Sequence, residues 1–286
     1  MLTEIPLAVA ASAFFALTFI FSRLATREAT PVFGGFVASA TVTLLYLPWI
    51  AASVPMSAFA NPHLLWFVGL GVITPSISRT FQFAGVQRIG AAPSGILRGL
   101  GPLFSSTLAV LLLGERLTPI LALGTALIIF GIVVLSIRKG EMRSWALTGI
   151  AYAIGATLIW VMRDLIIRYS SPDVPYKTLA IFVMAGTSSI VMALVLANSK
   201  SGRKDFTGKG LFYFILVGLA SFSALTSLFF ALEEGRIVVV TPITSAQPLF
   251  VLLFSRFLPQ GMEPLTPLMV LGAAFIVAGG ALISLA

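Results

Sequence analysis

The feature that most constrains this chain is a series of long apolar runs separated by short polar breaks. Ten runs occur, at roughly residues 5–24, 32–54, 64–86, 89–113, 119–137, 145–167, 178–197, 210–232, 237–258 and 265–286. A helix needs about 20 apolar residues to cross the hydrocarbon of a bilayer, where only a closed helical ladder pairs the backbone groups. The sequence therefore predicts an all-α integral membrane protein with ten transmembrane helices and no extramembrane domain. We expect it in a prokaryotic inner or plasma membrane.

The composition excludes several functional classes. Charged residues make up 10% of the 286 residues, against about 25% in a soluble domain. The chain has no cysteine and a single histidine, His63, which excludes thiolate and multi-histidine metal sites. It also lacks the HExxH, Gly-x-Ser-x-Gly and GxxxxGK[ST] motifs, so neither an enzyme nor an ATP-driven pump is favoured. We expect no cofactor and no nucleic-acid partner.

The chain contains an internal repeat. Residues 117–136 match residues 265–284 without gaps, and Gly124 and Gly131 fall on Gly272 and Gly279. The match divides the chain into two five-helix repeats, about 1–140 and 141–286. An odd number of spans in each repeat makes the second copy cross the membrane in the opposite sense. Inverted repeats of this kind favour a substrate site in a central cavity between the halves and transport by alternating access.

The end of each repeat carries a motif that resembles a known family. In the first half a proline, Pro102, is followed by an acidic residue, Glu115, by Leu117-Thr118 and then by a glycine-rich helix. This pattern is similar to the EamA repeat of the drug/metabolite transporter superfamily. The resemblance implies a transporter of amino acids, nucleotide sugars or other metabolites. It leaves the substrate open.

Two arginines lie inside predicted spans, where ionisable residues are costly and are functional candidates by default. Ser76, Arg79 and Gln82 are spaced i, i+3 in the third span, which predicts that they share one helical face. Ser94 and Arg98 are spaced i, i+4 in the fourth span. Neither arginine has an arginine at the equivalent position of the other half, as expected for an asymmetric substrate site.

Arg79 and Arg98 have two interpretations. In the first, both face the cavity and bind an anionic group, since a guanidinium makes paired, charge-assisted bonds and stays ionised. In the second, each forms an internal salt bridge, with Asp164, Glu233 or Glu234 as the partner.

Further candidates come from the second half. Trp160 and Asp164 lie in the sixth span, and Asp164 has no acidic counterpart in the first repeat, which makes it a candidate for the cavity or for proton coupling. Thr241, Thr244 and Ser245 lie in the ninth span, and we expect this polar face to form the opposing wall of the cavity.

Other basic residues lie near span ends and bear on orientation. Arg23 and Arg163 are repeat equivalents, and we expect both to snorkel to the interface. Loops on the side of the termini hold Arg116, Arg168, Lys177 and Arg236; loops on the other side hold Arg27, Arg88, Arg138, Lys139, Arg143, Lys200, Arg203, Lys204, Lys209 and Arg256. The positive-inside rule thus favours external termini, whereas the family resemblance implies cytoplasmic ones.

These observations predict a secondary transporter of small polar metabolites, such as an amino acid, an organic acid or another anionic or zwitterionic solute. Its partners are the substrate, membrane lipid and either protons or a counter-substrate, and it is a monomer or a homodimer. A multidrug or cationic-solute exporter and a channel are the alternatives. The first two spans contain no acidic residue, which disfavours the glutamate-based mechanism of small multidrug exporters.

Overall fold

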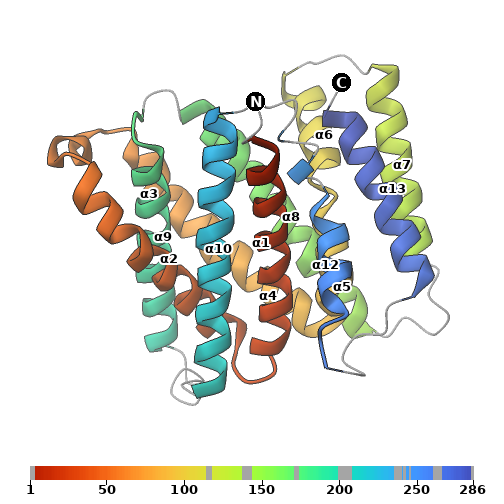
Figure 1. Cartoon of the computed structure of the whole chain (residues 1–286), viewed down its shortest axis with the longest axis horizontal. Helices are drawn as coiled ribbons and strands as arrows, with labels where there is room; N and C mark the ends of the chain where they lie inside the picture. The colour runs from red at the N-terminus through yellow and green to blue at the C-terminus, as the bar shows by residue number, and fades with distance from the viewer. Residues whose placement is uncertain are drawn as a thin grey trace.

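The computed structural model describes residues 4–113, 118–136, 144–170, 174–198, 208–234, 240, 243–244, 246–259 and 266–284, and within these ranges it contains helices and no strand (Figure 1). The helices are α1 (Glu4–Ala25), α2 (Pro31–Ser53), α3 (Leu64–Ile73), α4 (Arg79–Ile89), α5 (Ala91–Arg98), α6 (Gly101–Leu113), α7 (Pro119–Ser136), α8 (Ser144–Ser170), α9 (Lys177–Asn198), α10 (Gly208–Glu234), α12 (Gln247–Ser255) and α13 (Pro267–Ser284). A 3₁₀ helix, η1 (Met56–Ala60), follows α2, and a π-helix, η2 (Thr74–Ser78), joins α3 to α4.

Several helices have the length and polarity of membrane spans. Five described segments are long and apolar enough to cross a bilayer: Ile5–Ala25, Pro31–Ser53, Leu64–Ile89, Lys177–Asn198 and Gly208–Ala231. Three further apolar helices, Ala122–Gly131, Leu147–Arg163 and Pro267–Ile283, are shorter. Large apolar side chains such as Leu44, Leu65 and Ile190 are more than 60% exposed. Outward-facing apolar side chains of this size fit a multi-pass membrane protein.

The third apolar run of the sequence is not a uniform α-helix. It passes from α3 through the π-helix η2, which contains Pro75, into α4. At the end of α4 the chain turns at Gly90, whose φ of 98° lies in the left-handed region that favours glycine. Gly90 leads directly into α5, which packs against α4.

Most of the helix packing joins a helix of the first repeat to a helix of the second. Helices α2 and α9 pack together, as do α5 and α12, and α7 and α13; each pair joins equivalent spans of the two repeats. The pair α1–α10 is matched by the pair α8–α4, in which each helix is replaced by its repeat equivalent. The helices of one repeat therefore cover those of the other, and the interface between repeats forms the centre of the bundle.

Helices α7 and α13 approach each other through four glycines. A Cβ atom added to Gly131 would lie 2.7 Å from the Gly272 carbonyl oxygen, and one added to Gly279 would lie 2.5 Å from the Gly124 carbonyl oxygen. The residue numbers rise along one helix as they fall along the other, so the two helices are antiparallel. They lie side by side at one edge of the bundle (Figure 1).

Candidate functional site

A cavity of about 100 Å³ lies between the two halves of the chain. Its lining comes from α1, α2, η2, α4 and α5 of the first half and from α8, α9, α10 and α12 of the second. Helices α7 and α13 contribute none of the described lining residues. The cavity is smaller than the roughly 300–1,000 Å³ of pockets for drug-sized ligands. Its size in this conformation therefore suits a small solute.

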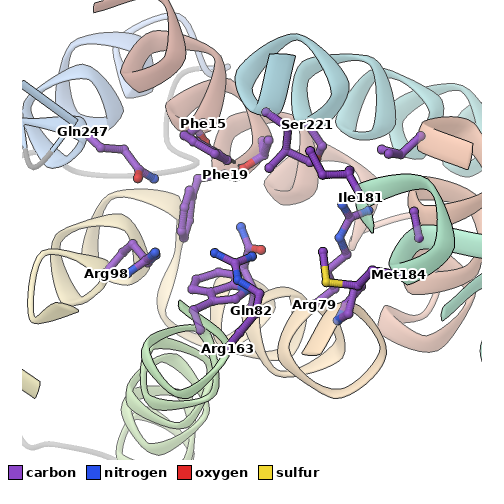
Figure 2. A pocket seen from close by; sticks show the side chains of 16 residues that line it. Phe15, Phe19, Arg79, Gln82, Arg98, Arg163, Ile181, Met184, Ser221 and Gln247 are labelled. Carbon is purple, nitrogen blue, oxygen red and sulfur yellow. Dashed lines mark hydrogen bonds between the residues drawn. The ribbon is translucent and has the colours of Figure 1, made fainter. Parts of the chain in front are cut away.

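Three arginines line this cavity: Arg79 from α4, Arg98 from α5 and Arg163 from α8. In Figure 2 Arg98 and Arg79 lie on opposite sides of the cavity and Arg163 lies between them. The amides of Gln82 and Gln247 also point into this space. Among the described lining residues none is an aspartate or a glutamate. The described side chains that meet here thus offer many hydrogen-bond donors, among them three guanidinium groups.

Arg79 holds an unsatisfied donor. Its Nη1 is covered by protein and has no hydrogen-bond partner among the described residues. Arg163 lines the same cavity as Arg79. Leaving a buried charged donor without an acceptor is expensive, and an anion that accepts from it restores the lost hydrogen bond. The geometry around Arg79 therefore fits an anionic ligand.

Arg98 is held differently. Its guanidinium carbon lies 4.6 Å from the centre of the Trp160 ring, within the range of a cation–π contact. Trp160 comes from α8, so this contact links the two repeats. The packing against an indole face uses the flat side of the guanidinium, whereas its N–H groups lie around the edge.

Four of the residues predicted from the sequence converge on the cavity: Arg79, Gln82, Arg98 and Trp160 all line it. Ser94 lies beside them, in a small recess that it shares with Gln82 and Trp160. The Ser94 hydroxyl is buried and, within the described part of the chain, has no hydrogen-bond partner.

Ser76 lies away from the cavity, although its spacing predicts a face shared with Arg79 and Gln82. Its hydroxyl donates to the Gly71 carbonyl at 3.0 Å and lies 3.0 Å from the Ser188 hydroxyl of α9. The reason is that Ser76 belongs to the π-helix η2, whose wider turns break the i, i+3 relation of a regular α-helix.

The remaining predicted residues do not join this group. Thr244 is described and does not line the cavity. Thr241 and Ser245 lie outside the described residues, and so do the side chains of Asp164, Glu233 and Glu234. The predicted wall from the ninth span is represented instead by Gln247, which precedes Pro248 in α12.

Arg163 is the main functional candidate that sequence reasoning assigned differently. The structure places its side chain in the lining of the cavity. Its equivalent Arg23 also contacts another helix: its Nη1 donates to the carbonyl oxygens of Val86 and Gln87 in α4, both at 2.9 Å. Helix α8 continues to Ser170, so Arg163 lies about two turns inside its helix.

Gln247, Thr18, Phe19 and Ser221 also line the cavity and were not singled out from the sequence. Within the described residues there is no group of three or more metal-ligating side chains. The described side chains that line the cavity offer guanidinium groups, amides and hydroxyls to a ligand.

Comparison with known proteins gives a family match for both halves of the chain. Residues 2–137 and residues 147–285 each match the EamA-like transporter family. No curated protein matches the chain. A solved structure described only as "Crystal structure of protein" is similar over 96% of this chain and 94% of its own, with a TM-score of 0.65 and 18% sequence identity. At that identity the likeness shows the fold alone.

Proposed function

The chain belongs to the EamA-like transporter family, and from this premise we propose that it is a secondary transporter of small anionic or zwitterionic metabolites that works by alternating access. The observation that carries the proposal is the cavity lined by Arg79, Arg98 and Arg163, with a buried, unsatisfied donor on Arg79. Three guanidinium groups attract an oxyanion and repel a cation. The same observation disfavours the alternative of a cationic-drug exporter.

Alternating access requires two halves that can move against each other around a fixed site. We propose ten spans, arranged as inverted repeats of residues 1–140 and 141–286. The antiparallel packing of α7 against α13 supports inversion, because these helices are repeat equivalents. The start of α1 and the end of α13 lie at the same end of the bundle, which fits an even number of crossings (Figure 1). Coupling to protons or to a counter-substrate is part of the same proposal.

The test uses the purified full-length protein and three probes, succinate, L-glutamate and inorganic phosphate. Specific binding raises thermal stability by mass action, so a thermal-shift assay first identifies the probes that bind. We expect Arg79→Gln and Arg98→Gln each to weaken binding by roughly 10- to 100-fold, the effect of losing a charged hydrogen bond. Arg88→Gln is the matched control, because Arg88 packs on Tyr152 and does not line the cavity.

Transport is then measured in proteoliposomes. A carrier accelerates uptake of labelled probe when unlabelled probe is present inside, whereas a channel does not. Binding that is unchanged in both cavity-arginine variants would refute the anion site. Uptake without counterflow would refute alternating access and favour the channel.

A further inference from the structure

The strongest feature that the proposed function leaves unexplained is the stack of Arg98 on Trp160. Trp160 lines the cavity, and an aromatic residue there could contact the substrate itself. Its ring is nevertheless already occupied on one face, because the Arg98 guanidinium carbon lies 4.6 Å from its centre. The question is whether Trp160 acts on the solute or on Arg98.

Trp160 is well suited to hold another group in place. It packs against an apolar cluster that contains the buried Phe19 and Ile20 of α1, Val86 of α4 and Val251 of α12. A ring packed against a cluster that includes residues of three other helices has little freedom to move. Whatever stacks on that ring is therefore fixed in orientation as well.

The other surroundings of Arg98 also define its position. Its Nη1 approaches Gly101 so closely that a Cβ atom at that residue would lie 2.9 Å from it. Gly101 is the first residue of α6 and has no left-handed backbone that would demand glycine. Its lack of a side chain therefore leaves the space that the guanidinium occupies.

From these contacts we infer that Trp160 is a positioning residue: the indole and the space above Gly101 hold Arg98 so that the N–H edge of its guanidinium meets a carboxylate or phosphate group of the solute. A guanidinium held by one face can still make two parallel hydrogen bonds through its edge, which matches the geometry of these groups. This inference rests on the proposed function and assigns separate roles within it. Arg98 binds the anionic group, and Trp160 acts through Arg98.

The same helix supplies a control. Tyr152 lies two turns before Trp160 on α8, and its ring carries Arg88 at 4.7 Å, with Arg88 Nη1 donating to the Ala84 carbonyl. This second stack has the same chemistry and does not line the cavity. A loss of aromatic–arginine packing can thus be compared inside and outside the site on one helix.

The experiment measures dissociation constants for succinate, L-glutamate and inorganic phosphate on purified full-length variants. We expect Trp160→Leu to weaken binding by roughly 5- to 30-fold and Trp160→Phe to weaken it less, following the strength of the cation–π contact. Tyr152→Leu should leave binding within about twofold of wild type. In an Arg98→Gln background, Trp160→Leu should have no further effect, because its target is gone.

A second variant disturbs the position of Arg98 without changing either Arg98 or Trp160. Gly101→Ala places a methyl group against the guanidinium, and we expect weaker binding with thermal stability close to wild type. Wild-type binding in both Trp160→Leu and Gly101→Ala would overturn the inference, and so would an equal Trp160→Leu effect with and without Arg98. If instead no probe binds, or if Arg79→Gln and Arg98→Gln both bind normally, the proposed function fails, and the inference about Trp160 fails with it.

Discussion

The close approach of α7 and α13 gives a quantitative prediction for Gly279→Ala. The new Cβ atom would lie 2.5 Å from the Gly124 carbonyl oxygen and 3.0 Å from the Ile128 backbone nitrogen. Carbon–oxygen contacts are comfortable at about 3.3 Å or more, so the two backbones must separate by roughly 0.8 Å. These two atoms belong to backbone, which cannot rotate away as a side chain can; the Ile128 Cγ1 atom, at 2.8 Å, must shift as well.

The cost follows from two opposing effects. Forcing one methyl group into a packed interface costs about 1–3 kcal/mol, and the small residues of membrane helix interfaces are what allow backbones to meet. Replacing a helical glycine by alanine returns up to about 1 kcal/mol of helix propensity. Because the nearest contacted atom is a backbone oxygen at 2.5 Å, we place the packing cost in the upper half of its range and expect a net loss of about 1–2 kcal/mol. At about 2–4 °C per kcal/mol for a chain of this size, the unfolding temperature should fall by roughly 2–8 °C.

The assay is thermal unfolding of the purified protein in detergent, followed by intrinsic tryptophan fluorescence. Gly69→Ala in α3 is the matched control, because a Cβ atom there meets nothing within 4 Å. That variant should keep or slightly raise the unfolding temperature. An unfolding temperature for Gly279→Ala equal to or above that of wild type would refute the close packing of α7 on α13.

Two further predictions concern hydrogen bonds between helices. Tyr46→Phe removes the hydroxyl that lies 3.0 Å from the Thr226 hydroxyl, and we expect a loss of about 1 kcal/mol, measured as a lower unfolding temperature that Thr226→Val does not lower further. Arg23→Gln removes a donor shared by the Val86 and Gln87 carbonyls at the end of α4; we expect a loss of about 1–3 kcal/mol in the same assay, and wild-type stability would contradict this clamp.

The apolar runs predicted the helices well because span length and polarity are local properties. The run at 32–54 corresponds to α2 (Pro31–Ser53), and the run at 178–197 to α9 (Lys177–Asn198). The match between residues 117–136 and 265–284 likewise led to the family, since two copies of a motif are visible without any structure. The ten-span inverted arrangement stays a proposal, with five described segments long enough to cross.

The site was predicted in part. Arg79 and Arg98 were found because a charge inside an apolar run is conspicuous, and Gln82 followed from helical spacing. Ser76 could not be placed correctly, because spacing assumes regular α-helix and η2 is a π-helix. Arg163 was not proposed for the cavity, because the repeat pairs it with Arg23 near a span end. Its place in the cavity lining depends on how α8 packs against α4, α5 and α6, which its neighbours in the sequence do not show.

The π-helix η2 also determines how the third span tolerates changes in length. A π-turn is equivalent to one residue inserted into an α-helix, and each residue of an α-helix accounts for about 100° of rotation. Deleting one residue from Thr74–Ser78 would let the segment anneal into continuous α-helix and would turn everything before it by that angle relative to Arg79. The shortened span could then keep only one of two contacts, that of Arg79 with the cavity or that of α3 with α9. The extra residue in η2 thus sets the rotation of α3 relative to α4. Shortening η2 by one residue should therefore be more harmful than substituting any of its side chains.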